Sequence, residues 1–353
     1  MCRRFVASLV ARIFPVVVLL LVIIQISAAQ FDRALPPIAD PADKRFVGVK
    51  EDWTSPALNA SSLRAVQTMR GYIHEYSGYT VELDRAQWRW GDPIDIYIVK
   101  PTGVKKPPVI LYLYGYPTDT DMFQDEEWQR NAIKEGFAAV GIVSALTGQR
   151  YHDRPLKEWF LSELQECLAT SAHDVQMLIN YLETRDDVDA SRVGMFAQGS
   201  GASIAILASA ADPRIRVLDV MDPWGDWPAW IATSPFPPKD ERDGFLKPEF
   251  LKKAGVLDPV EWLPKVQAKK FQLEQNDFDK ITPANVKETL RSAVSTGTSV
   301  VVYKTVKDLD SAGASSTNVG WIRQKLQALA QPGPKAGAPS LSAGAGRAVD
   351  NKE

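Results

Sequence analysis

One stretch of twelve residues, 192–203, constrains the fold of this chain more than any other. It reads RVGMFAQGSGAS, so a short apolar run ends at a cluster of small residues, and the apolar helical pattern ASIAILASAA follows at once. Such a pattern predicts a buried strand that passes through a sharp turn directly into a helix. Strand and helix patterns alternate along most of the chain, which predicts an α/β fold with a doubly wound, mostly parallel sheet.

The other predicted elements lie on both sides of this turn. Leu63, Val66, Met69 and Ile73 recur at helical spacing, which predicts a helix over residues 62–75. Strands are predicted over residues 80–83, 94–99, 109–114, 138–143, 193–196, 214–220, 271–273 and 299–304, and further helices over 124–136, 154–184, 283–292 and 321–329.

The small residues of the turn match a nucleophile elbow, in which the nucleophile sits between two small residues because strand and helix pass close together. The small-x-nucleophile-x-small frame falls on AQGSG, residues 197–201, and puts Gly199 at the nucleophile position. The alternative frame makes Ser200 the nucleophile, but it requires the large Gln198 where a small residue is needed. In the first frame, Ser200 should begin the helix and point away from an oxyanion site.

At this point the sequence resembles the α/β-hydrolase family, especially its acyl-esterase, dienelactone-hydrolase and prolyl-peptidase-like branches. In these proteins the elbow strand often opens R-[IV]-G, with the nucleophile seven residues after the arginine, and this spacing leads from Arg192 to Gly199. The resemblance covers roughly residues 70–330. It implies an α/β-hydrolase fold with a small cap insertion, and it implies that the usual nucleophile is missing.

The resemblance also implies a position for the catalytic acid. The family's acid commonly lies in a loop of the form G-x-x-D-x-[IV]-T-P, and Asp279 in QNDFDKITP aligns with it. The same segment reads as a helix start, with Thr282 as N-cap and Pro283 at the first helical position. A structural turn would therefore explain Asp279 without catalysis.

The histidine that the family places after its last strand should lie near residues 304–310, but none occurs there. The chain has His74 and His173 within helical patterns, where a packed or surface histidine is the ordinary role, and His152 in a loop. All three precede the elbow. Because neutral serine needs a base, the sequence indicates a degenerate triad, with Ser200 and Asp279 as the remaining catalytic candidates.

Aromatic residues flank the elbow in the predicted sheet. Tyr116 follows the strand at 109–114, where the family often has an HG-containing oxyanion loop that contributes a backbone amide. The segment MDPWGDWPAW contains Trp224 and opens an insertion at about residues 223–269, which matches the place of the family's cap. Ligands bind at this edge of open α/β sheets, so we expect Tyr116 and Trp224 to line an apolar binding site. The alternative is that the tryptophans form the core of the cap.

Three aspartates, Asp219, Asp222 and Asp226, form another candidate set near the carboxyl edge of the sheet. Paired carboxylates at this edge could perform acid–base chemistry. Orienting the turns around the tryptophans is the more ordinary role for them, because structural networks also contain perturbed carboxylates.

The N-terminus predicts export. A basic start, an apolar run and small residues at a cleavage site form a secretory signal over residues 1–29, with Arg3-Arg4, residues 13–26 and Ser27-Ala28-Ala29. Cleavage would leave Gln30 as the first mature residue of a periplasmic or extracellular protein. Without cleavage, residues 13–29 would anchor the chain in a membrane. A linker over 30–52, a domain over 53–330 and a disordered tail over 331–353 should follow.

Composition limits the classes of function. A net charge of −2 gives no reason to expect nucleic acid as a partner. Mature protein would keep only Cys167, and no Cys or His spacing indicates a metal, so we predict neither metal nor cofactor. The leading hypothesis is a non-catalytic protein that binds a small apolar molecule or an unknown protein partner. The alternatives are an active carboxylic-ester or peptide hydrolase that uses Ser200, and a structural envelope protein held by an uncleaved N-terminal helix.

Overall fold

The computed structural model describes residues 51–58, 68–89, 92–116, 121–145, 161–312 and 319–330. All of these except Arg89 belong to one compact unit. The predicted signal peptide, most of the predicted linker, the loop with His152 and the predicted tail lie outside the described residues. Within the described ranges, no helix combines the length and the apolar character needed to span a membrane.

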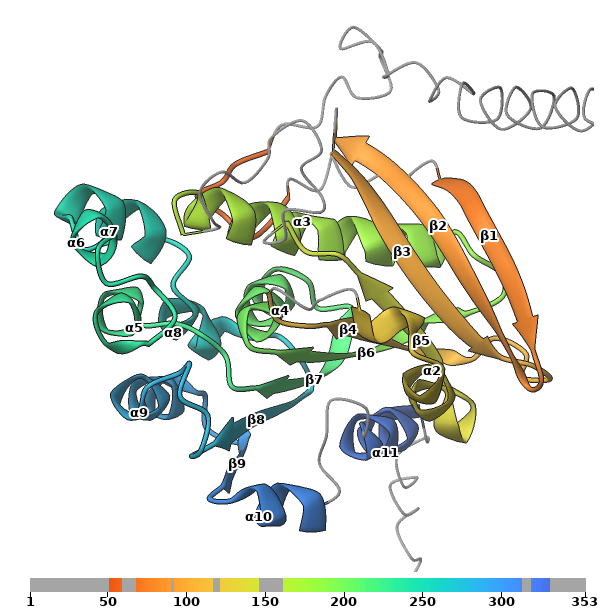
Figure 1. The fold of residues 1–353 in the computed structure, drawn as a ribbon. Coiled ribbons are helices and arrows are strands. Elements are labelled where there is room, and N and C mark those ends of the chain that lie inside the picture. The colour runs from red at the N-terminus through yellow and green to blue at the C-terminus, as the bar shows by residue number, and fades with distance from the viewer. Residues whose placement is uncertain are drawn as a thin grey trace, which may run out of the picture. The chain divides into compact units, whose positions relative to one another are not determined.

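A single nine-stranded sheet runs through the described part of the chain (Figure 1). Its spatial order is β1-β2-β3-β5-β4-β6-β7-β8-β9. The pairs β1–β2 and β3–β5 are antiparallel, whereas the ladder from β5 through β4 and β6 to β9 is parallel. The strands are β1 (Thr68–Tyr76), β2 (Tyr79–Arg89), β3 (Asp92–Pro101), β4 (Pro108–Leu113), β5 (Ala138–Ile142), β6 (Asp189–Gln198), β7 (Ile215–Met221), β8 (Lys270–Asn276) and β9 (Ser299–Tyr303). The predicted α/β class and mostly parallel sheet are confirmed.

Helices cover both faces of this sheet. Figure 1 shows α3 (Leu164–Glu183) and α4 (Ser200–Ala211) on one face, and α2 (Glu126–Ala132) and α11 (Gly320–Ala330) on the other. Each face of the sheet has its own hydrophobic core, and β4 contributes side chains to both. Val109 and Leu111 pack in the core with α3 and α4, whereas Ile110 packs in the core with α2 and α11. Continuous apolar runs are expected for strands buried on both faces.

The remaining helices lie in the segments that connect the strands. Short 3-10 helices η2 (Asp121–Gln124) and η3 (Lys134–Gly136) flank α2. Between β7 and β8 the chain forms a helical insertion, and two more helices flank β9. The insertion contains α5 (Trp227–Thr233), α6 (Arg242–Phe245), α7 (Pro248–Gly255), α8 (Pro259–Trp262) and η4 (Leu263–Lys265), while α9 (Ala284–Ala293) and α10 (Val306–Ser311) lie before and after β9.

The helix predicted over residues 62–75 is wrong where the structure describes it, because Thr68–Tyr76 is strand β1. Met69 and Ile73, the two described residues of the suggested helical face, are exposed, at 56% and 43% accessible. Strand β1 pairs with β2 instead, with a bulge between Arg70 and Tyr72. Pairing with a neighbouring strand outweighs local periodicity here, because strand formation depends on the partner more than on intrinsic preference.

Candidate functional site at the elbow

The turn from β6 into α4 has the backbone of an elbow. Gly199 lies at its corner with φ 59° and ψ −127°, a conformation that is strained for any residue with a Cβ. Its amide donates to the carbonyl of Met221 at 2.9 Å. A Cβ on Gly201 would lie 2.4 Å from the carbonyl oxygen of Leu113, so close passage of helix and strand requires glycine there. The geometry therefore follows the frame that puts Gly199 at the nucleophile position.

Position 199 has room for a Cβ but offers no reactive group. An added Cβ would meet Trp224 Nε1 at 3.6 Å and the Cα of Gly115 at 3.7 Å, which are ordinary van der Waals distances. The indole of Trp224 thus lies beside the place where a nucleophile's side chain would project.

Ser200 begins α4, as expected, and is only 2% exposed. The expectation that it points away from the oxyanion loop is wrong, because its Oγ accepts a hydrogen bond of 2.9 Å from the Tyr116 amide. This amide belongs to the loop after β4, where the resemblance predicted an oxyanion donor. The Ser200 hydroxyl therefore takes up the hydrogen bond that an oxyanion would need.

Asp279 follows β8, and its carboxylate accepts hydrogen bonds from backbone amides of its own turn. Oδ1 accepts from the Ile281 amide at 3.1 Å, and Oδ2 accepts from the Thr282 amide at 3.0 Å. Helix α9 then begins at Ala284, with Pro283 as its N-cap rather than its first residue. This arrangement supplies a structural role for Asp279.

Lys287 of α9 holds the loop that contains Asp279. This residue was not identified from the sequence. This buried lysine donates to the carbonyl of Asn276 at 2.5 Å and to the carbonyl of Asp279 at 2.7 Å. Its Nζ also lies 4.0 Å from Asp279 Oδ2. The available signal was its place beside Val286 and near Leu290, on the apolar side of the helix pattern, which is buried.

The aspartates after β7 orient turns. Asp222 is buried with a positive φ of 49°, and its Oδ1 accepts from the Asn276 amide at 2.8 Å. Burial raises the pKa of Asp222 to about 7, although the hydrogen bonds from Asn276 oppose this shift. Asp226 also has positive φ, at 50°, and its amide donates at 2.8 Å to Asp258, another residue that the sequence did not single out.

The two aromatic candidates, Tyr116 and Trp224, both pack against the ring of Phe236. Trp224 stacks on Trp230 with 4.9 Å between ring centroids and lies 5.0 Å from Phe236. Tyr116 packs edge-on against Phe236 at 6.2 Å. Trp224 is buried at 3% exposure, whereas Tyr116 and Phe236 are half-buried. The structure therefore brings Tyr116 and Trp224 into one aromatic cluster, and the exposed part of that cluster is Tyr116 and Phe236.

The two described histidines lie elsewhere. His173 on α3 is buried, with Nδ1 2.8 Å from Glu51 Oε1 and Nε2 2.9 Å from the Ser55 carbonyl. His74 lies in β1, not in a helix, and stacks on Tyr72. Within the described ranges, neither histidine contacts the elbow or Asp279, and no group of three or more possible metal ligands occurs.

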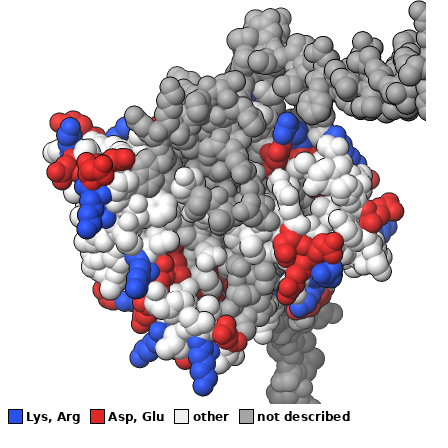
Figure 2. Space-filling view, in the orientation of Figure 1, with Lys and Arg blue, Asp and Glu red and all other residues white. Residues whose placement is uncertain are grey.

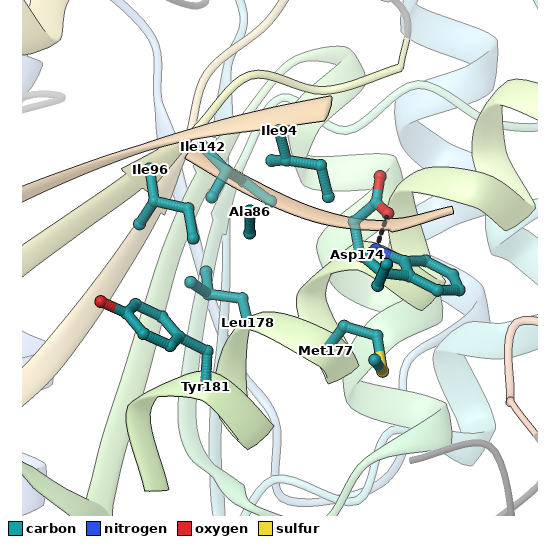
Figure 3. A pocket seen from close by; sticks show the side chains of 9 residues that line it. Ala86, Ile94, Ile96, Ile142, Asp174, Met177, Leu178 and Tyr181 are labelled. Atoms are coloured by element: carbon teal, nitrogen blue, oxygen red, sulfur yellow. Dashed lines mark hydrogen bonds between the residues drawn. The ribbon is translucent and has the colours of Figure 1, made fainter. Parts of the chain in front are cut away.

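The described part of the chain also has a small apolar cavity away from the elbow, between α3 and strands β2, β3 and β5 (Figure 3). Asp174 lines it and accepts a 2.9 Å hydrogen bond from Trp88 Nε1. At about 10 Å³ it has room for roughly one water molecule. On the surface seen in Figure 2, acidic and basic residues lie beside one another, with no broad area of one sign among the described residues.

Comparison with known proteins supports the fold. No protein-family model and no curated protein matches the chain. Among solved structures, acetyl xylan esterase 1 from Thermoanaerobacterium sp. JW/SL YS485 is similar at 16% identity and a TM-score of 0.52, over 75% of this chain and 88% of that one. An acetyl xylan esterase from Paenibacillus sp. R4 is similar at 14% identity and 0.51, over 81% and 99%. This chain therefore has the α/β-hydrolase fold, and at these identities the likeness concerns the fold alone.

Proposed function

We propose that this protein is a non-catalytic protein with the α/β-hydrolase fold, which binds a small apolar molecule at the carboxyl edge of the sheet beside Tyr116. One observation carries the proposal. Gly199 occupies the corner of the elbow while the Ser200 hydroxyl accepts the hydrogen bond of the Tyr116 amide.

The groups that acyl transfer needs are either missing from their expected positions or used for other contacts. A serine hydrolase requires a nucleophile, a base and free amide donors for the oxyanion. Glycine at 199 cannot attack a carbonyl. Ser200 is buried and bonded to an amide that should stay free, and both carboxylate oxygens of Asp279 accept from its own loop. These contacts support a site that binds without turning over an ester.

A rival proposal is an active carboxylic-ester or peptide hydrolase that uses Ser200. Hydrolysis of a p-nitrophenyl ester and labelling by a fluorophosphonate separate the two. We expect neither turnover nor label for the wild type, Ser200→Ala or Gly199→Ser, since serine at 199 would still lack a base. Ser191→Ala, at an exposed serine, is the matched control. A covalent adduct on Ser200 and turnover that Ser200→Ala removes would overturn the proposal.

Binding rests on the aromatic cluster. Tyr116 and Phe236 present partly exposed rings next to the buried indole of Trp224, an arrangement suited to a flat or apolar ligand. Titration with a panel of apolar esters and acids should change tryptophan fluorescence, and Tyr116→Ala should weaken that change. A response of the wild type to none of the panel would favour the alternative of an unknown protein partner.

We also propose that the protein is exported and periplasmic or extracellular. The charged, apolar and small-residue sections of residues 1–29 support this, although they lie outside the described residues. N-terminal sequencing of the mature protein should begin at Gln30. Recovery of intact Met1 in membrane extracts would instead support an anchor formed by residues 13–29.

A further inference from the structure

Strand β9 (Ser299–Tyr303) lies at one end of the sheet (Figure 1), and among the described residues its outer edge has no neighbouring strand. Its pairing with β8 has no register shift. Side chains add to this pairing, because Ser299 Oγ donates to Gln272 Oε1 at 3.2 Å and the Tyr303 hydroxyl donates to Glu274 Oε1 at 3.2 Å. The inner side of β9 is therefore held in place, and its outer side is a regular strand edge.

The backbone groups on this outer edge belong to Val300 and Val302. The carbonyl of Tyr303 accepts from the Asp277 amide at 2.8 Å, so Tyr303 directs its backbone polar groups toward β8. Along a strand, the N–H and C=O groups of successive residues point to opposite sides in alternation. Those of Val300 and Val302 therefore point to the open edge, where no described strand receives them. Such a row of backbone groups is a template for another strand.

The same two valines have exposed side chains. Val300 is 41% and Val302 38% accessible, and Val300 lies on the face of the sheet that carries Leu273. No charge, proline or bulge interrupts β9, although these are the features that normally keep sheet edges from pairing. The opposite edge has such features, because β1 contains a bulge and the charged side chains of Arg70 and Glu75. The two edges of the sheet are therefore not equivalent.

The residue pattern of β9 matches a second copy of the same strand. In an antiparallel arrangement centred on Val301, Val300 of one copy lies opposite Val302 of the other and exchanges both backbone hydrogen bonds with it. The two-fold axis repeats this exchange. Val301, whose backbone groups point to β8, then falls at the axis, where the antiparallel pattern requires no hydrogen bonds. The exposed valines of the two copies thus meet one another.

The charged residue next to β9 fits the same register. Lys304 lies opposite Thr298 of the second copy, so the two copies of Lys304 stay at opposite ends of the joined strands. A register centred on Val302 would set Lys304 against Val300. One centred on Val300 would set Val302 against Thr298. The register centred on Val301 is therefore the one that pairs valine with valine and keeps the lysines apart.

We propose that the outer edge of β9 is a docking surface for a second copy of this chain, and that antiparallel β9 strands join two sheets into a two-fold symmetric dimer. This interface is independent of ligand binding at the elbow. Because the surface is self-complementary, association closes at two copies. The bulged and charged β1 edge does not extend the joined sheet further.

Analytical ultracentrifugation of the full-length protein between about 1 and 100 μM tests the proposal. The wild type should form a dimer and no larger species. Val302→Pro removes an N–H that points outward, so it should leave the pairing with β8 intact. Because the two-fold axis doubles each lost hydrogen bond, the dissociation constant of the dimer should rise at least about tenfold.

A lysine substitution gives a second variant with a matched control. Val302→Lys places a charge where the valines meet and should also weaken the dimer at least about tenfold, which keeps the test decisive if Val302→Pro does not fold. Val256→Lys, at a valine of similar exposure (40%) at the end of α7, should dimerise as the wild type does.

Oxidative cross-linking tests the register and the partner. The Cα atoms of an antiparallel pair without hydrogen bonds lie about 4.5 Å apart, within the range of a disulfide. In a Cys2→Ser background, where the remaining Cys167 is buried, Val301→Cys should form a covalent dimer. Val300→Cys should form much less, because its own copy lies two residues away along the partner strand, beyond about 7 Å.

A wild type that is monomeric at every concentration would overturn the proposal, and protection of β9 amides from hydrogen exchange in that monomer would show that another segment of the chain covers the edge. A dimer that both Val302 variants leave unchanged would also overturn it. So would cross-linking of Val300→Cys as complete as that of Val301→Cys.

Discussion

Strands β2 and β8 lie toward opposite ends of the sheet (Figure 1), and they bury carboxyl groups in different surroundings. At the β2 end, Glu82 and Asp84 are surrounded by cations. Arg185 Nη2 lies 2.8 Å from Glu82 Oε2, and its Nη1 lies 3.1 Å from Asp84 Oδ2. Arg70 Nε adds a 3.1 Å contact to Asp84 Oδ1, and Lys100 Nζ lies 2.5 Å from Glu82 Oε1.

At the β8 end, the described residues that hydrogen-bond to Asp219 and Glu274 are neutral, namely the amide of Gln272 and the hydroxyl of Tyr303. The difference shows that burial alone does not determine the charge of a carboxyl group. Ion pairs compensate the buried acids at one end, whereas at the other end burial raises the pKa of Asp219 and Glu274.

Removal of Arg185, the cation that contacts both Glu82 and Asp84, should have the largest effect on stability. Arg185→Met leaves two buried carboxylates short of a partner, so we expect a loss of about 3–5 kcal/mol in the free energy of unfolding. Urea denaturation measures it. Arg192→Met removes a more exposed arginine paired with Asp189 and should cost about 1 kcal/mol or less. Equal losses in the two variants would show that the buried ion pairs at β2 contribute no more than a partly exposed pair.

Lys287 tests whether a buried cation beside β8 matters as much as Arg185. Lys287→Met removes the donor to the carbonyls of Asn276 and Asp279 and should destabilise the protein by about 1–2 kcal/mol. The exposed Lys280→Met should change stability by less than about 0.5 kcal/mol. A loss as large as that of Arg185→Met would show that both ends depend on cations.

The elbow lies between the two ends and should be less sensitive than either. Ser200→Ala removes one neutral hydrogen bond to the Tyr116 amide, so we expect a loss of about 1 kcal/mol or less, measured by urea denaturation. A loss as large as that of Arg185→Met would contradict this expectation.

The smallest expected effect is the acid response of the β2 end. Burial tends to raise the pKa of Asp187, but hydrogen bonds from Arg185 and Lys100 hold it well below its usual range. A depressed pKa contributes stability above the unfolded value, near about 4, and that stability is lost as the pH falls through the folded pKa. Asp187 is partly exposed, so solvent screening reduces its contribution to stability. We therefore expect the opening of β2 amides to rise only about threefold between pH 5 and 3. Opening that rises with alkali instead would contradict the assignment.

Local patterns predicted much of the fold. The apolar runs of β4, β6 and β7 identified a parallel sheet because strands buried on both faces have no polar alternation. The small residues after Phe196 located the corner at Gly199, since the close passage of strand and helix restricts side-chain size within a few residues. These constraints act within one segment of the chain, so they can be recognised from the sequence alone.

Contacts between distant segments were not predicted. Strand β1 was mistaken for a helix because its partner β2, not its own periodicity, determines its conformation. In β8 the alternation of Phe271 and Leu273 with Gln272 and Glu274 suggests a solvent-facing side, yet both sides are buried. Likewise the hydrogen bond from the Tyr116 amide to Ser200 joins residues 84 positions apart and has no local signature.

The backbone at Gly199 has a consequence for how this domain could have changed over time. A residue with a Cβ at φ 59° and ψ −127° carries strain of about 1–3 kcal/mol, which an enzyme tolerates because the corner exposes its nucleophile. Glycine adopts the same conformation without that strain. Serine at position 199 would therefore cost stability before any added base could supply activity.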